Sequence, residues 1–201
     1  MNLSQKEKRF ISKPGHFEVA VICSPEDLPG EQAWLQALLE AGVERLHLRK
    51  KHWSMWQTAA FLDSLPAAYH SRIILHAHPG LLKHYALAGF HGKQAQATNA
   101  PLRGCSVHSY EEYGALYAHY DYLWLSPFFD SLSKQGYAAS EALWQPPAHC
   151  PLDKVVALGG IAPQHLPRLA RLGIRRAAVL GYIWNAKDPV KAWKTLQNIQ
   201  M

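Results

Sequence analysis

The sequence predicts an α/β protein that folds as a single (β/α)8 barrel. Short apolar runs rich in β-forming residues alternate with segments of helical periodicity, a pattern typical of parallel strands joined by crossover helices. Eight such runs occur within 201 residues, and no Gly/Ser-rich linker divides the chain, so we expect one compact domain. A flavodoxin-like open sheet is the rival architecture, but it needs only about five strands. The eight runs therefore favour the closed barrel.

Each predicted element follows from its local pattern. Strands are expected at Phe17–Cys23, Arg45–Leu48, Arg72–Leu75, Gly89–His91, Gly104–Val107, Tyr122–Leu125, Lys154–Leu158 and Ala177–Leu180. Helices are expected at Glu31–Ala41, Trp53–Leu65, Pro79–Leu87, Tyr110–His119, Gln164–Leu172 and Pro189–Asn198. The crossover from Lys93 to Arg103 is short and polar, which predicts a short or missing helix after the fourth strand. Residues 1–15 lack an apolar pattern and are expected to form an arm before a barrel domain at 16–201.

Composition narrows the class of protein. The net charge of +6 comes from Lys and Arg that are scattered along the chain, which argues against nucleic acid as the partner. Three distant cysteines suggest reduced thiols, and no stretch approaches the length of a membrane span. We therefore expect a cytoplasmic protein that binds no membrane and recognises an anionic small molecule. The sequence leaves the oligomeric state open and allows a homo-oligomer.

Polar residues at the ends of the predicted strands supply the candidate site, because barrel chemistry resides at the C-terminal face. The second strand runs into Arg49 and Lys51, two cations able to clamp a phosphate, although a basic strand end is an equally good description. The fifth strand ends at His108, the best general acid/base candidate. Ser109 and Glu112, which follow it, match the start of a helix through a capping box.

Glycines and hydroxyls near the last strands predict an anion site. Gly159 and Gly160 follow the seventh strand and Gly181 follows the eighth, where backbone N–H groups of phosphate-handling barrels meet their ligand. Turn formation alone is the plainer explanation of these glycines. The loop after the sixth strand adds two hydroxyls and a cation, Ser131, Ser133 and Lys134.

Taken together, these segments resemble the thiamin phosphate synthase/TenI family. The similarity spans about residues 17 to 185 and rests on LHLRKK, GFHGKQ, GCSVHS, SPFFDSLSK, VVALGGI and AAVLG, in the family's order. The resemblance implies a TIM barrel in thiamin biosynthesis that binds a small phosphorylated thiazole. Synthases of the family join a pyrimidine diphosphate to a carboxythiazole phosphate with magnesium. TenI relatives are thiazole tautomerases that move protons through a histidine at the position of His108.

The sequence departs from the synthase pattern at the metal. The family's magnesium-binding acids correspond to Ala77 and Gln96, and His47 replaces a glutamine. His76 and His78 could bind zinc as a pair, but no third ligand is evident from the sequence, so no metal site is predicted.

Three functions remain open on these observations. A TenI-type tautomerase comes first, with His108 and Lys134 as catalytic residues and no cofactor. A divergent thiamin phosphate synthase, which would need Mg²⁺, and a catalytically silent ligand-binding barrel are the alternatives.

Overall fold

The computed structural model describes residues 17–130 and 138–199, and it confirms the predicted barrel. Eight parallel strands pair in chain order, and β1 closes the sheet by pairing with β8. Their bounds are β1 Glu18–Ile22, β2 Leu46–Leu48, β3 Ile73–Leu75, β4 Gly89–His91, β5 Leu102–Val107, β6 Tyr122–Leu125, β7 Val155–Ala157 and β8 Arg176–Val179. Each predicted strand lies within two residues of an observed one.

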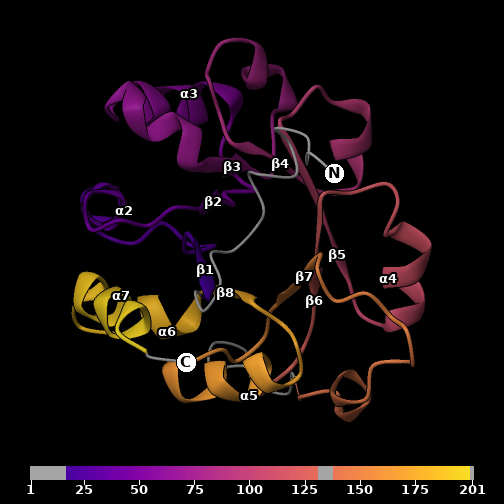
Figure 1. Cartoon of the computed structure of the whole chain (residues 1–201). Coiled ribbons are helices and arrows are strands. Elements are labelled where there is room, and N and C mark those ends of the chain that lie inside the picture. Colours follow the sequence, from indigo (N-terminus) through magenta and orange to yellow (C-terminus); the bar gives the residue numbers. More distant parts are fainter. Residues whose placement is uncertain (1–16, 131–137, 200–201) are drawn as a thin grey trace.

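The helices surround the strands, as Figure 1 shows. The α-helices are α2 Glu31–Glu40, α3 Met55–Asp63, α4 Tyr110–Leu116, α5 Leu166–Arg171, α6 Gly181–Trp184 and α7 Pro189–Gln197. Short 3-10 turns complete the crossovers: η1 Ala67–Arg72, η2 Pro79–Lys83, η3 Lys93–Ala97, η4 Glu141–Trp144 and η5 Pro163–His165. The reduced crossover predicted after the fourth strand is confirmed, since only η3 lies between β4 and β5.

The helix predicted at Pro79–Leu87 is wrong. Only the 3-10 turn η2 forms there, and it follows His78, whose backbone is left-handed with φ 56°. Gly80 is a poor helix former, and the chain must reach β4 by Gly89. Apolar spacing alone does not reveal that the connection is too short for a full helix.

Two groups of apolar side chains form the core. The larger packs between the strands and the surrounding helices, and the smaller fills the barrel with Ile74, Tyr122, Trp124 and their neighbours. Gly104 faces the Tyr122 ring so closely that a Cβ would lie 2.0 Å from Cζ. The interior therefore depends on a glycine to admit this aromatic ring.

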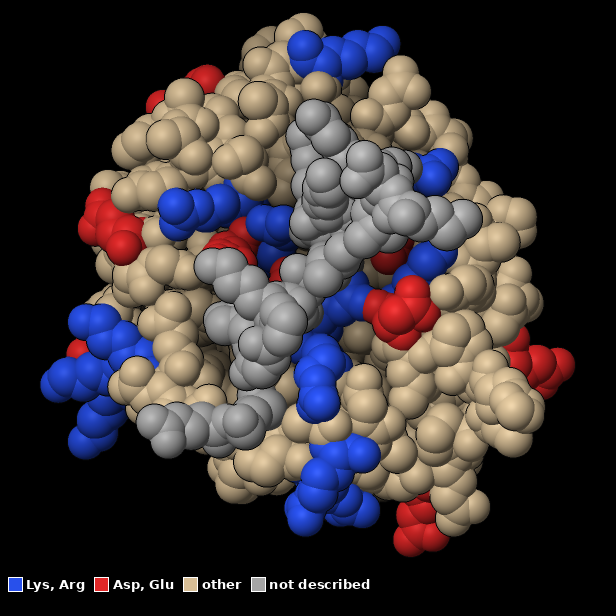
Figure 2. Space-filling view, viewed as in Figure 1, with Lys and Arg blue, Asp and Glu red and all other residues tan. Residues whose placement is uncertain are grey.

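The surface carries dispersed charge. Figure 2 shows Lys and Arg at several separate places on one face, with Asp and Glu among them. In the described part of the chain, no helix combines the length and apolarity that crossing a bilayer requires.

Candidate functional site

The cations that follow β2 differ in their surroundings: one is buried in ion pairs, and another lies on the surface. Lys50 is 3% exposed and forms ion pairs with Glu31 and with Asp27, the latter at 3.2 Å. It also donates to the Glu26 carbonyl at 2.6 Å. Lys51, in contrast, is exposed. Lys50 therefore fixes the β1–α2 loop against β2, and only its two neighbours in sequence remain for a ligand.

His108 lies at the rim after β5, as predicted from the sequence. Its imidazole is exposed, and Nδ1 lies 3.2 Å from the Ser126 carbonyl oxygen. Ser109 caps α4 by accepting from the Glu112 N–H at 3.1 Å, as expected. The Glu112 carboxylate accepts from the His108 N–H instead of the Ser109 N–H that a capping box uses. The glutamate thereby holds the backbone of the candidate catalytic residue.

The turn after β7 packs against the segment after β6. Gly159 and Gly160 have φ of 97° and 60°, conformations that other residues rarely adopt. Phe129 N–H donates to the Gly159 carbonyl at 3.1 Å, and a Cβ on Gly160 would lie 2.1 Å from the Asp130 carbonyl oxygen. Within the described residues, the N–H groups of both glycines donate to no protein acceptor.

The Ser126–Asp130 segment connects the predicted site residues. His108 contacts Ser126, while the β7 turn contacts Pro127, Phe129 and Asp130. Gly181 begins α6 after β8, which runs parallel to β7. The predicted loop residues Ser131, Ser133 and Lys134 lie outside the described residues.

A histidine cluster inside the barrel was missed by the sequence reasoning. Ring nitrogens of His47, His76 and His91 lie within 4.8 Å of one another. His78, which the sequence suggested as a partner of His76, instead contacts the Trp53 carbonyl oxygen through Nε2 at 2.7 Å. His78 is therefore not part of the cluster.

Burial controls the charge of this cluster. It lowers the pKa of His47 and His76 well below the usual range, and that of His91 to about 3. The positive charge of Arg49 also lowers the pKa of His76 and His91, so this guanidinium acts on the same part of the barrel. All three imidazoles are neutral at pH 7.

The residues present do not fit the magnesium that the family resemblance implies. Magnesium requires hard oxygen ligands, usually carboxylates together with substrate phosphates. The two family acid positions hold Ala77 and Gln96, and the described cluster nearby supplies imidazole nitrogens. We therefore assign no magnesium site.

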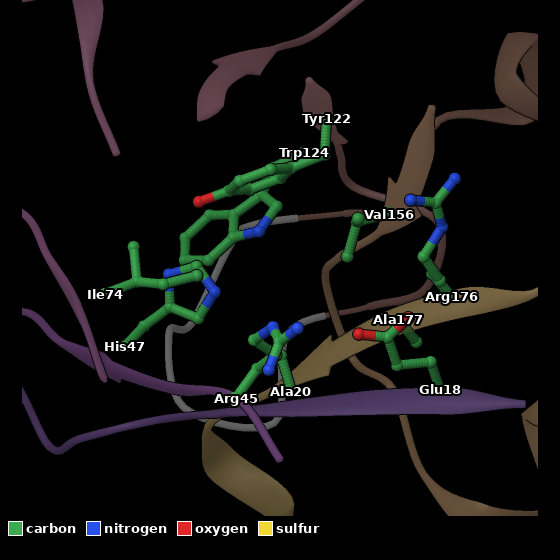
Figure 3. A pocket seen from close by; sticks show the side chains of 10 residues that line it. All are labelled: Glu18, Ala20, Arg45, His47, Ile74, Tyr122, Trp124, Val156, Arg176 and Ala177. Carbon is green, nitrogen blue, oxygen red and sulfur yellow. The ribbon is translucent and has the colours of Figure 1, made fainter. Parts of the chain in front are cut away.

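A small cavity inside the barrel includes one member of this cluster, His47, in its wall. Its lining residues are Glu18, Ala20, Arg45, His47, Ile74, Tyr122, Trp124, Val156, Arg176 and Ala177. Figure 3 shows the His47 ring beside the Trp124 indole, with Arg45 and Glu18 also in view. The predicted anion residues, including Arg49 and Gly160, do not line this cavity. That His108 and the glycine turn serve one site at the C-terminal face of the barrel stays a prediction.

Known proteins match this chain along most of its length. A family model described as thiamine monophosphate synthase matches residues 19–183. The thiamine-phosphate synthase of Klebsiella pneumoniae is 30% identical, over 78% of this chain and 82% of its own. A thiamine phosphate pyrophosphorylase structure from Bacteroides thetaiotaomicron has 29% identity and a TM-score of 0.74, covering 89% of this chain and 95% of that one.

More distant structures support the fold alone. A thiamine phosphate pyrophosphorylase from Pyrococcus furiosus has 22% identity, a TM-score of 0.70, and coverage of 90% of this chain and 94% of its own. The closed barrel and the family match over residues 19–183 agree with one another. This chain belongs to the thiamine monophosphate synthase family.

Proposed function

We propose that this chain binds thiamin precursors at the C-terminal mouth of the barrel and joins a pyrimidine diphosphate to a thiazole phosphate, with release of pyrophosphate. The observation that carries the proposal is the similarity to curated thiamine-phosphate synthases, which reaches 30% identity over 78% of the chain. This similarity favours the transferase over the tautomerase that the sequence analysis placed first.

The proposal gives the mouth residues separate tasks. Arg49 and Lys51 bind the diphosphate, because two cations at one strand end can neutralise several phosphate oxygens. The N–H groups of Gly159 and Gly160 hold the thiazole phosphate, with Gly181, Ser131 and Ser133 completing that anion site. These cations must offset charge that magnesium neutralises in other family members.

The direct test supplies purified protein with both substrates, with and without magnesium, and measures thiamin phosphate after oxidation to fluorescent thiochrome. Replacement of Arg49 by Gln should raise the KM for the pyrimidine diphosphate, whereas Arg171→Gln, on the exposed end of α5, should not. A flat time course with wild-type protein under both conditions would refute the synthase.

A thiazole tautomerase is the second candidate, favoured by two specific observations. His108 is an exposed imidazole at the rim, and the acids that hold magnesium in synthases are replaced by Ala77 and Gln96. A proton shift within one ring needs an acid/base group and an anion clamp, but no metal. In this proposal His108 moves the proton, and Lys134 assists it as a second catalytic residue.

Tautomerase activity predicts turnover of the carboxythiazole phosphate in the presence of a chelator. His108→Asn should abolish that turnover and leave phosphate binding intact, while His119→Asn, an exposed histidine elsewhere, should change neither. Normal turnover by His108→Asn would exclude this candidate. Tight binding of the thiazole phosphate without conversion in either assay would identify the silent binding barrel.

A further inference from the structure

Three histidines converge inside the barrel from neighbouring strands. His47 lies in β2 and His91 ends β4, while His76 immediately follows β3. His47 is 2% exposed and His91 is 4% exposed, so these polar rings occupy positions that apolar side chains fill elsewhere in the barrel. Buried imidazoles in such proximity need a shared partner or a hydrogen-bond network.

The ring nitrogens have the spacing of a metal ligand set. Nδ1 of His47 lies 3.0 Å from Nε2 of His76, and one nitrogen from each of the three rings lies within 4.8 Å of the others. Three nitrogens bound to one tetrahedral zinc ion stand about 3.3 Å apart, given zinc–nitrogen bonds of about 2.0–2.1 Å. The His47–His76 pair already stands close to that separation, and the His91 nitrogen would have to approach the pair on metal binding.

The surroundings orient one ligand and shield the group. Nδ1 of His91 lies 3.2 Å from the Tyr122 hydroxyl, and Nε2 lies 3.0 Å from the Ser106 hydroxyl. A metal bound through Nε2 would take the place of the Ser106 contact and leave the Tyr122 contact on the opposite side of the ring. Such a second contact fixes the orientation of a metal-binding imidazole. The Trp124 indole packs against all three imidazoles, with centroid separations of 4.6 Å to His47, 5.2 Å to His76 and 4.0 Å to His91.

We propose that His47, His76 and His91 bind one divalent transition metal of the zinc type, each through one ring nitrogen, with a further coordination position open to water or an anion. Imidazole suits zinc, cobalt, nickel and copper, whereas magnesium requires oxygen ligands. Three protein ligands and one open position are typical of catalytic zinc. The proposal concerns metal binding and does not depend on which reaction the barrel catalyses.

Protonation and charge are consistent with a metal. Because burial lowers the pKa of all three imidazoles, their lone pairs are available at neutral pH without loss of a proton. Arg49 contributes positive charge nearby, which disfavours a bare cation but favours a metal that carries a hydroxide or phosphate oxygen. We therefore expect phosphate to tighten metal binding.

The experiment uses the full chain, freed of metal by dialysis against a chelator and then titrated with Zn²⁺ in competition with a chromophoric chelator. Wild-type protein should bind one equivalent, and added Co²⁺ should give the intense visible absorption of a four- or five-coordinate site. His76→Gln should weaken Zn²⁺ binding by about 100-fold or more, since even partners behind the ligands change affinity by about 10–100-fold. Urea unfolding of each variant confirms that it is folded.

Two further variants separate the cluster from the other histidines of the chain. Tyr122→Phe keeps the ring but removes the hydroxyl that contacts His91, and should weaken Zn²⁺ binding by about 10–100-fold. His84→Gln, at an exposed histidine, should bind like wild type. The proposal is overturned if wild-type protein takes up no stoichiometric zinc, if folded His76→Gln binds zinc as tightly as His84→Gln does, or if Co²⁺ keeps the weak spectrum of its hexaaqua ion.

Discussion

Replacement of Gly160 by Ala tests whether close packing against the segment after β6 stabilises the turn that follows β7. Gly160 has a φ of 60°, and a non-glycine residue in this left-handed region costs roughly 1–2 kcal/mol. The new Cβ would also lie 2.1 Å from the Asp130 carbonyl oxygen, a backbone atom that must move. Overpacking of this kind typically costs about 1–3 kcal/mol. We expect the free energy of unfolding to fall by about 2–5 kcal/mol in total.

Gly30→Ala provides the matched control for backbone strain. Gly30 has a φ of 72°, but a Cβ there would meet no atom within 4 Å, so only the conformational cost applies. The free energy of unfolding measured in urea should therefore be about 1–3 kcal/mol lower for Gly160→Ala than for Gly30→Ala, and this difference is the contribution of the clash.

The same two variants test the anion site. Inorganic phosphate that binds the folded state raises the unfolding midpoint, and this rise should shrink in Gly160→Ala but persist in Gly30→Ala. Equal stability of the two variants would refute the packing argument, and an equal response to phosphate would refute the anion site at this turn.

Three further predictions concern buried groups. Lys50→Met should destabilise the fold by about 3–5 kcal/mol in urea, because it leaves the Glu31 carboxylate buried without its cation. In metal-free protein, burial holds the pKa of His91 at about 3 while an unfolded histidine titrates near 6.5, so the unfolded chain binds more protons between these values. Stability should therefore fall as the pH drops from 6.5 toward 3. The difference between the urea midpoints at pH 7 and 5 should become smaller in His91→Gln but persist, because His47 and His76 also have lowered pKa values. Burial raises the pKa of Cys23 to about 12, so iodoacetamide should label the half-buried Cys150 first, as peptide mass spectrometry can report.

The sequence was sufficient for the barrel because its strands are buried on both faces. Runs such as Tyr122–Leu125 are continuously apolar, and each lies between turn signals that bound it within a residue or two. The failure at Pro79–Leu87 has a different origin, since the spacing of apolar residues there suits a helix while the connection from β3 to β4 admits only a 3-10 turn. The spacing of apolar residues gives no information about the distance that a crossover must span.

The residues of the candidate site also differ in how far the sequence could predict them, because some depend on one strand and others on packing between distant elements. His108 and the glycine turn follow single strands, so position along the chain was enough to place them at strand ends. Lys50 stands between the two predicted ligand cations in the sequence, but its ion pair with Glu31 depends on how α2 packs, which the sequence does not reveal.

The histidine cluster depends on register between strands. Ile74 pairs with Gly89, so His76 and His91, each two residues further along, project from the sheet on the same side as Ile74, which points into the barrel. His47 pairs directly with Ile74 and joins them from β2. Three histidines separated by 29 and 15 residues therefore become neighbours only once the pairing of β2, β3 and β4 is known. Alternation within each strand then requires all three rings to enter the same interior. The sequence shows only His78 close to His76, and for this reason no third ligand was evident from it.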